Sequence, residues 1–192
     1  MLWMPTVEAM YPYGPQGAVH MRVPGVTDVL EGAHRPGHFD GVATVVSRLF
    51  NQVMPDVAAF GRKDYQQLAV IRYMARDLAF PIDILAGDTL RETDGLAMSS
   101  RNQYLSAEER PKAALIHRTL RLMRERLEAG RSRHSVEDEA SADLRAGGFD
   151  VDYAVVRTAD LTEPGDEGGA RVALIAARLG KTRLIDNVEF TR

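Results

Sequence analysis

A repeated alternation of helical and strand patterns in the first half of the chain constrains its fold more than any other feature. Two segments carry apolar residues at helical spacing, and each is followed by a short apolar run that is typical of a buried strand. Prolines at positions 55 and 81 stand beside these strands, where a helix ends or a strand opens. Strands that alternate with helices pair in parallel through right-handed crossovers, so the sequence predicts an α/β unit. The expected helices cover residues 39–54 and 64–78, and the expected strands cover residues 56–60 and 82–85.

The pattern changes after Tyr104. Ser106 and Glu109 stand at the spacing of a helix capping box, and Gly130 is placed to end the helix that they open. A second helix and then three strand patterns follow, and we expect the strands to form an antiparallel sheet. The helices are expected over residues 106–128 and 135–145, and the strands over residues 149–157, 171–177 and 182–190.

Two domains follow from this change of pattern. We expect residues 1–103 to form an α/β domain and residues 104–192 to form a smaller α+β lid domain. A mobile connection near residue 103 is expected, because a lid over a bound nucleotide must move. Ahead of the α/β pattern, residues 19–23 alternate like a short strand and residues 27–31 form a helical turn.

Composition excludes several classes of protein. The net charge of −3 gives no indication of nucleic-acid binding, and the absence of cysteine excludes disulfides, thiolate catalysis and cysteine-based metal sites. No signal peptide and no apolar run of membrane-spanning length is recognised, and a reducing cytoplasm fits the cysteine count. A cluster of basic residues is expected to be a solvated helix face: Arg118, Arg121, Arg124 and Arg126.

The turn after the first strand has the features of an anion site. Gly61 allows the chain to turn sharply, Asp64 is placed to cap the following helix, and Lys63 adds a positive charge. Gln67 shares a helix face with Lys63 and Asp64, whereas Gln66 is rotated away from it. Taken alone, the same turn is more often a solvated turn than a site.

A second polar loop follows residues 94–97. Met98 is followed by two hydroxyls, an arginine and an amide, a set of groups that binds phosphate oxygens well: Ser99, Ser100, Arg101 and Asn102. This loop too could be no more than a surface loop. Both loops in one α/β unit together favour a nucleotide site.

Four blocks resemble the pantoate–β-alanine ligase (pantothenate synthetase) family. Residues 60–68 are similar to its FGEKDxQQL signature, and residues 94–102 are similar to its DGLAMSSRN loop. Residues 35–42 and 184–187 match two further blocks, in the same order along the chain. The resemblance implies a Rossmann-like nucleotidylyl-transferase domain that is N-terminally incomplete, with a C-terminal lid.

The resemblance also implies a reaction, a location and a set of site residues. Pantoate would be activated by ATP and Mg²⁺ to a pantoyl adenylate, β-alanine would then form pantothenate, and the family consists of cytoplasmic homodimers without nucleic-acid or membrane partners. The implied catalytic residues are Lys63, Ser99, Ser100 and Arg101. The implied ATP-binding residues are Gly61, Arg62, Lys63, Asp64, Leu90, Met98, Ser99, Ser100 and Arg101. The implied substrate-binding residues are Gln67, Arg35 and His38, with no resident metal ligands.

Two departures from the family pattern stand out. Arg62 replaces the usual glutamate, which reverses a charge beside the expected phosphates. The H-x-G-H motif of the family's N-terminal part does not occur, and Leu2–Trp3 aligns with the family's third strand. A sheet without its first two strands would expose an edge, so we expect the chain alone to be unstable or inactive.

Three functions remain open from the sequence. The first is the ATP-dependent ligase. The second is a truncated, catalytically impaired nucleotide-binding or dimerising fragment of the family. The third is another nucleotidylyl transferase of the same superfold, because a fold alone does not determine a substrate.

Overall fold

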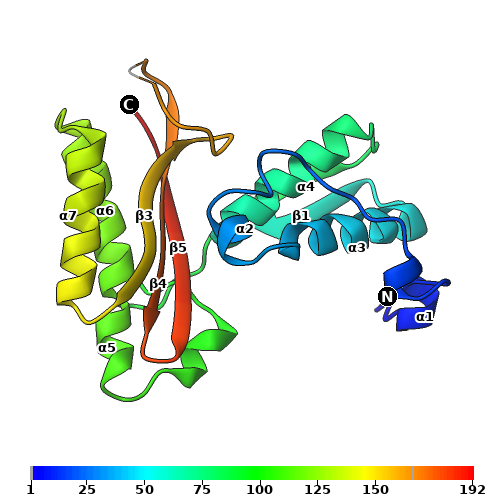
Figure 1. Cartoon of the computed structure of the whole chain (residues 1–192), viewed down its shortest axis with the longest axis horizontal. Helices are drawn as coiled ribbons and strands as arrows, with labels where there is room; N and C mark the ends of the chain where they lie inside the picture. Colours follow the sequence, from blue (N-terminus) through cyan, green and yellow to red (C-terminus); the bar gives the residue numbers. More distant parts are fainter. Residues whose placement is uncertain (1, 166) are drawn as a thin grey trace. The chain divides into compact units, whose positions relative to one another are not determined.

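The computed structural model describes residues 2–165 and 167–192, and the chain divides into two compact units (Figure 1). Unit 1 comprises the residues up to 60 together with residues 66–87, and unit 2 comprises residues 61–65 and 88–192. No helix in the described part of the chain is long and apolar enough to cross a membrane. The two-domain division at residue 103 stays a prediction.

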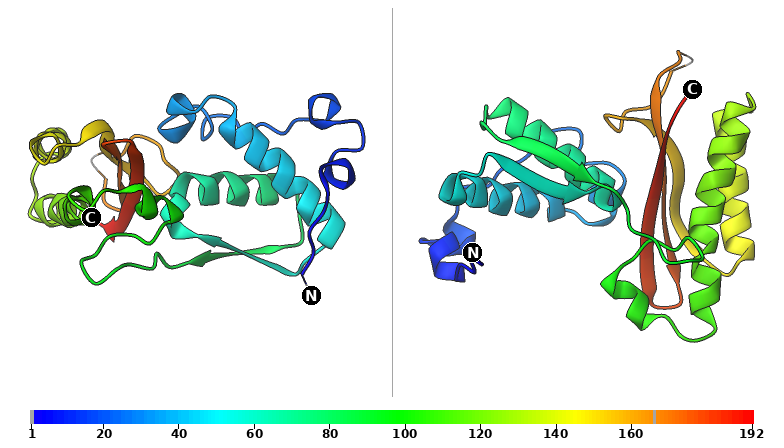
Figure 2. Two further views of the ribbon diagram at one scale, coloured as in Figure 1. Left: turned by 90° about the horizontal axis from the view of Figure 1, so that it is seen from below. Right: turned by 180° about the vertical axis from the view of Figure 1, so that it is seen from behind.

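Unit 1 contains a two-stranded parallel sheet of β1 (Val57–Gly61) and β2 (Asp83–Gly87). Helices α3 (His38–Val53) and α4 (Tyr65–Asp77) lie along the sheet on the same side (Figure 2). All four elements lie within one or two residues of their predicted bounds. Alternate residues of both strands are exposed, so the opposite face of this sheet is largely open to solvent in this chain.

Aromatic and aliphatic side chains, mostly from α3 and α4, form the core of unit 1, and partly buried side chains of the two strands pack against it. The Phe50 ring meets the rings of Phe60 and Phe80 edge-on, with centroids 6.4 and 5.6 Å apart. The predicted helical spacing accounts for the buried positions, because residues three and four apart share one helix face. The core is made of Val23, Phe39, Ala43, Val46, Phe50, Val70, Ile71, Met74 and Ala75.

The two strands expected near the N-terminus were wrong. Residues 2–3 and 19–23 are irregular, and the first helix, α1 (Val7–Met10), follows the former. Met21 donates its backbone N–H to the Thr44 hydroxyl of α3 instead of to a strand (2.9 Å). An extended segment needs a partner ladder to be a strand, and here its backbone is satisfied by a side chain.

The segment around residue 31 also differs from expectation. The helical turn predicted over residues 27–31 is a set of hydrogen-bonded turns that leads into α2 (Glu31–His34). Gln66 of α4 holds this segment, because its side-chain oxygen accepts from Glu31 N (3.0 Å) and its amide donates to the carbonyls of Val26 (2.6 Å) and Val29 (2.7 Å).

Unit 2 is a three-stranded antiparallel sheet in the order β3-β4-β5, as predicted. Helices α6 and α7 lie together against one face of the sheet (Figures 1 and 2). The elements are η3 (Ser100–Tyr104), α5 (Glu109–Ala113), α6 (Leu115–Glu128), α7 (Arg133–Ala146), β3 (Asp150–Thr158), β4 (Ala170–Leu179) and β5 (Thr182–Thr191).

Local signals in the sequence set the ends of these helices. Ser106 and Glu109 form the predicted capping box, in which each backbone N–H donates to the other's side chain at 2.8 and 3.2 Å. Gly130 follows α6 with φ of +84°, a backbone conformation that favours glycine. The Ser132 hydroxyl caps α7, which therefore begins slightly earlier than predicted.

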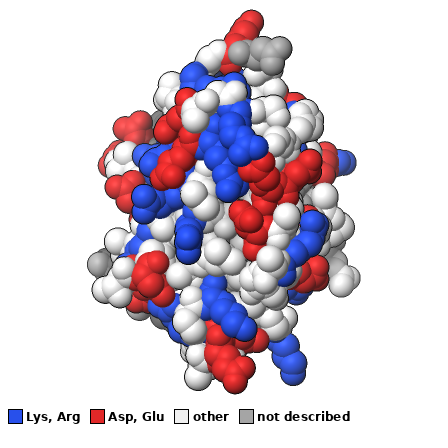
Figure 3. All heavy atoms as spheres, turned by 90° about the vertical axis from the view of Figure 1, so that its left-hand side faces the viewer, with Lys and Arg blue, Asp and Glu red and all other residues white. Residues whose placement is uncertain are grey.

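The arginine-rich face of α6 is only partly the solvated helix face that was predicted, because Arg118 and Arg121 are exposed whereas Arg124 and Arg126 are half-buried. Arg121 and Arg124 form ion pairs with the glutamates four residues later on the same helix. Arg126 instead bridges to Glu139 and Asp143 of α7. Basic and acidic side chains are interspersed over the side of the molecule shown in Figure 3.

Candidate functional site

The first predicted loop continues β1 into α4 through a short 3-10 helix, η2 (Arg62–Asp64). Gly61 has an ordinary extended backbone (φ −71°), and a Cβ there would meet nothing within 4 Å. The turn therefore does not require glycine, contrary to expectation. Asp64 is the last residue of η2 rather than a helix N-cap, because the 3-10 helix runs directly into the α-helix.

The structure brings the two predicted loops together within unit 2. The Lys63 ammonium donates to the carbonyl of Met98, with 3.1 Å between Nζ and oxygen. Burial lowers the pKa of Lys63, nearby Arg101 and Arg91 lower it further, and Asp64 and Asp186 oppose this shift. Lys63 is therefore a partly desolvated cation beside the Ser-Ser-Arg loop.

The second loop presents its polar groups from the start of η3. The Ser99 hydroxyl accepts from the backbone N–H of Arg101 (3.2 Å), which caps η3. The Arg101 side chain is exposed and donates a long bond of 3.4 Å to the carbonyl of Arg183. Asn102 ties the loop back on itself by donating to the carbonyl of Ala97 (3.1 Å). Ser100 and Arg101 thus face solvent on a locally ordered loop.

Leu90 and Met98 face one another across the base of this loop. The Met98 N–H donates to the Leu90 carbonyl (2.8 Å), next to an isolated bridge between Arg91 and Ala97. Both side chains are exposed, Leu90 by 71% and Met98 by 47%. Two exposed apolar side chains beside cationic and hydroxyl groups are suited to a ligand with an apolar ring and an anionic tail.

Strand β5 supplies two buried polar residues that sequence analysis recorded without assigning a role. The Asp186 carboxylate accepts two hydrogen bonds from Arg91, at 2.6 and 3.0 Å. Asn187 donates from its side-chain amide to the carbonyls of Arg62 (2.9 Å) and Lys63 (3.0 Å). Burial acts to raise the pKa of Asp186, but His117 and Arg91 together hold it below the ordinary aspartate value.

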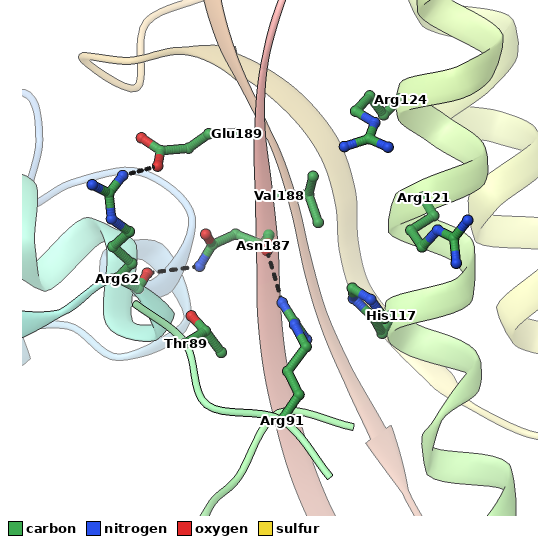
Figure 4. Close-up of a pocket in the computed structure, with 9 residues that line it drawn as sticks. All are labelled: Arg62, Thr89, Arg91, His117, Arg121, Arg124, Asn187, Val188 and Glu189. Atoms are coloured by element: carbon green, nitrogen blue, oxygen red, sulfur yellow. Dashed lines mark hydrogen bonds and ion pairs between the residues drawn. The ribbon is translucent and has the colours of Figure 1, made fainter. Parts of the chain in front are cut away.

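A polar groove of about 390 Å³ lies next to these groups (Figure 4). Arg62 is at one end, where it pairs with Glu189 and also with Asp88 (3.2 Å). The arginine that replaces the family's glutamate thus has acidic partners in this chain. The groove is lined by Arg62, Thr89, Arg91, His117, Arg121, Arg124, Asn187, Val188 and Glu189. The helix face that the sequence indicated as merely solvated contributes Arg121 and Arg124 to it.

The three predicted substrate-binding residues belong to unit 1. Arg35 ends α2 and donates to the Nε2 atom of His38 (3.2 Å), the first residue of α3. Gln67 is half-buried on α4, beside the fully buried Gln66. The adjacent glutamines therefore differ: Gln66 holds the fold of unit 1, and Gln67 is the accessible one.

A model of the pantoate-beta-alanine ligase family matches residues 1–189. The chain therefore belongs to this family of ligases, which confirms the resemblance and the fold class expected from the sequence.

Individual relatives agree with this assignment. The chain is 66% identical over 189 residues to a pantothenate synthetase of Stenotrophomonas maltophilia, covering 98% of the chain and 68% of that protein. It is 63% identical over 192 residues to one of Xylella fastidiosa, covering 99% of the chain and 68% of that protein. The chain thus spans about two thirds of the length of these relatives.

Solved structures extend the comparison to three dimensions. The crystal structure of pantothenate synthetase from Thermus thermophilus superposes with a TM-score of 0.88 at 46% identity, over 96% of this chain and 67% of that one. Pantoate-beta-alanine ligase from Francisella tularensis, complexed with beta-gamma ATP and β-alanine, gives a TM-score of 0.73 at 28% identity, over 94% and 61%.

Proposed function

We propose that the chain catalyses the ATP-dependent condensation of pantoate with β-alanine. In the first step the pantoate carboxylate attacks the α-phosphorus of ATP, the bond to the β-phosphate oxygen breaks, and pyrophosphate leaves. In the second step the amine of β-alanine attacks the acyl carbon of the pantoyl adenylate, loses a proton and releases AMP. Family membership supports the substrates, and the Francisella complex supports a nucleotide in a related protein.

The observation that carries the proposal is the contact between Lys63 and the carbonyl of Met98, directly before Ser99. This contact places the Lys63 ammonium in the same part of unit 2 as two hydroxyls and a guanidinium. Such groups stabilise charge that develops on a phosphate, because preorganised donors need no rearrangement during the reaction. We assign this role to Lys63, Ser99, Ser100 and Arg101, which carry little covalent chemistry of their own.

Neighbouring groups would complete the nucleotide site. Leu90 and Met98 would contact the base, although the Leu90 carbonyl is already engaged by Met98 N. Gly61, whose Cβ position is open, would allow the nucleotide to approach the backbone, and Arg62 and Asp64 would flank the phosphates. Gln67, Arg35 and His38 are proposed to bind pantoate or steady the nucleotide.

Mg²⁺ would bind as a complex with the triphosphate of ATP. The ion keeps several waters and is usually held by one or two carboxylates plus phosphate oxygens. Among the described residues there is no group of three or more histidine, aspartate or glutamate side chains that could hold a metal by itself. The phosphates of a bound nucleotide would therefore supply most of the oxygen ligands of the ion. When bound, the ion would add positive charge at the phosphates.

The proposal is tested by mixing the 192-residue chain with Mg-ATP, pantoate and β-alanine and measuring AMP, pyrophosphate and pantothenate. The ligase requires equal amounts of all three products, a result that would overturn the expectation that the chain alone is inactive, and Lys63→Met should lower the rate about a hundredfold or more. Omitting β-alanine should leave pyrophosphate release but no pantothenate. Replacement of pantoate by other hydroxy acids separates this activity from another nucleotidylyl transferase.

A second candidate is a nucleotide-binding fragment with impaired catalysis. Its support is that the Lys63 ammonium and the Ser99–Arg101 loop could bind phosphates without completing the reaction. ATP binding in calorimetry without pyrophosphate release would favour this candidate over the ligase. Sedimentation and fractionation would test the further proposal that the protein is a cytoplasmic homodimer.

A further inference from the structure

Asn187 connects strand β5 to the backbone of the Lys63 turn. Its side-chain amide donates to two consecutive carbonyls, those of Arg62 (2.9 Å) and Lys63 (3.0 Å). Asn187 is only 6% exposed, so both bonds are largely shielded from water. Two bonds from one rigid amide fix both the position and the direction of the short 3-10 helix η2.

Asp186, the preceding residue, connects the same strand to the other loop. Its carboxylate is held by Arg91, whose guanidinium also donates to the carbonyl of Gly95 (3.1 Å). Arg91 is bridged to Ala97, next to Met98. The Asp186 side chain is only 3% exposed and would be costly to bury without this partner.

Successive side chains of a strand point to opposite faces, and both of these polar residues are nevertheless buried. Asp186 lies on the face that carries the core residues Leu184 and Phe190, near His117 of α6. Asn187 lies on the opposite face, where it meets η2 (Figure 4). One dipeptide therefore anchors two loops that are far apart in sequence.

Together these hydrogen bonds form a closed series of contacts that joins the two loops and strand β5. It runs from Lys63 Nζ to Met98, through the Arg91–Ala97 bridge to Asp186, and through Asn187 back to the Lys63 carbonyl. We propose that Asn187, supported by the Asp186–Arg91 pair, is a positioning residue. It fixes where the Lys63 ammonium lies relative to the Ser-Ser-Arg loop. The inference deepens the function proposed above and rests on it, because it assigns the geometry of the phosphate-binding groups to β5.

The test compares Asn187→Leu, which keeps the side-chain volume and removes both donors, with the wild-type chain. Glu137→Gln is the matched control. Glu137 is a half-buried carboxylate that joins α7 to β3 by accepting from Val156 N (2.8 Å), away from both loops. Circular dichroism and thermal unfolding establish that each variant folds.

The first readout needs no nucleotide. The chain has three lysines, Lys63, Lys112 and Lys181, so ¹³C-labelled lysine gives three NMR signals that lysine-to-arginine variants assign. In Asn187→Leu we expect the Lys63 titration to move up toward the range of a free lysine, because the ammonium is released into water. Glu137→Gln should leave it unchanged, and a merely structural role for Asn187 would not move it.

The second readout is the affinity for Mg-ATP by calorimetry. Loss of two buried hydrogen bonds is expected to weaken binding about tenfold or more in Asn187→Leu, with no change in Glu137→Gln. Asn187→Ser, which retains one shorter donor, should give intermediate values in both readouts.

The proposal is overturned if folded Asn187→Leu keeps the wild-type Lys63 titration, or if Glu137→Gln shifts it equally. Should Asn187→Leu not fold, Asn187→Ser decides by the same criterion. A wild-type chain that does not bind Mg-ATP would count against the proposed function, and the lysine titration would still decide the role of Asn187.

Discussion

The Arg91 guanidinium donates hydrogen bonds to both carboxylate oxygens of Asp186, at 2.6 and 3.0 Å, although the two residues are 95 positions apart in sequence. Asp186 is almost completely buried and Arg91 is mostly buried. Planar pairs of this kind are specific in geometry as well as favourable in energy. The pair joins a family block at the C-terminus to the loop that carries the proposed phosphate donors.

Asp186→Asn should lower the free energy of unfolding of unit 2 by about 3 kcal/mol at neutral pH, because a buried pair loses one partner. The folded-state pKa of Asp186 is below the ordinary value. Its contribution is therefore complete above about pH 4, the unfolded aspartate pKa, and is lost as the pH falls through the lowered folded pKa. Hydrogen exchange of the β5 amides measures this. If Asp186→Asn lost the same unfolding free energy at about pH 7 and at about pH 2, the prediction would be contradicted.

Substitutions of the two adjacent glutamines of α4 should have different effects, one on stability and the other on substrate binding. Gln66→Ala removes the acceptor that Glu31 N–H uses and one donor from each of the Val26 and Val29 carbonyls, so unit 1 should lose about 2–4 kcal/mol. Gln67→Ala should change stability by less than about 0.5 kcal/mol and weaken pantoate binding. Urea unfolding followed by circular dichroism and calorimetry with pantoate measure the two effects; the reverse assignment would refute the distinction.

Alanine substitutions at two glycines of the site should have opposite effects on stability and nucleotide binding. Gly95 has φ of +93°, and a Cβ there would lie 2.7 Å from the His117 ring, so Gly95→Ala should destabilise unit 2 by about 2 kcal/mol. Gly61→Ala has no such obstacle and should leave stability unchanged while weakening Mg-ATP binding. Thermal unfolding and calorimetry check both, and a stable Gly95→Ala would show that the loop relaxes freely.

Restoring the family's glutamate should be unfavourable in this chain. Arg62→Glu would place a third carboxylate beside Glu189 and Asp88, with which Arg62 now pairs. These side chains are partly exposed, so a loss of only about 1 kcal/mol is expected. The swap Arg62→Glu with Glu189→Arg should recover most of it. A double-mutant cycle by chemical unfolding measures the coupling, and additive effects would exclude the pair as the cause.

Nucleotide affinity should depend on the protonation of Lys63. Burial lowers the pKa of this lysine, so its charge is lost at a pH below about 10.4, the value of a free lysine. Mg-ATP binding should accordingly weaken as the pH rises through the lowered pKa. Lys63→Arg, which stays charged, should bind with little dependence on pH up to about 10. Calorimetry between about pH 7 and pH 10 checks this, and identical profiles for both chains would rule Lys63 out as the titrating group.

Much of the architecture was readable from local pattern. Local patterns predicted α3, α4, α7 and all five strands, because periodicity reports which side of an element is buried. The single helix predicted over residues 106–128 is divided in the structure into α5 and α6. The capping box of Ser106 and Glu109 was also predicted, since both partners lie within one helical turn. The family followed from motifs that are contiguous in sequence.

Only the tertiary structure decided which distant residues hold these pieces together. Asp186 and Asn187 gave no local sign of bonding to Arg91 and to the Lys63 turn, and Gln66 looked like a residue merely rotated away from the site. Sequence determines the periodicity and the chemistry of each segment. Which buried donor meets which acceptor depends on the three-dimensional path of the chain, because such bonds join residues whose separation in sequence has no fixed relation to their separation in space.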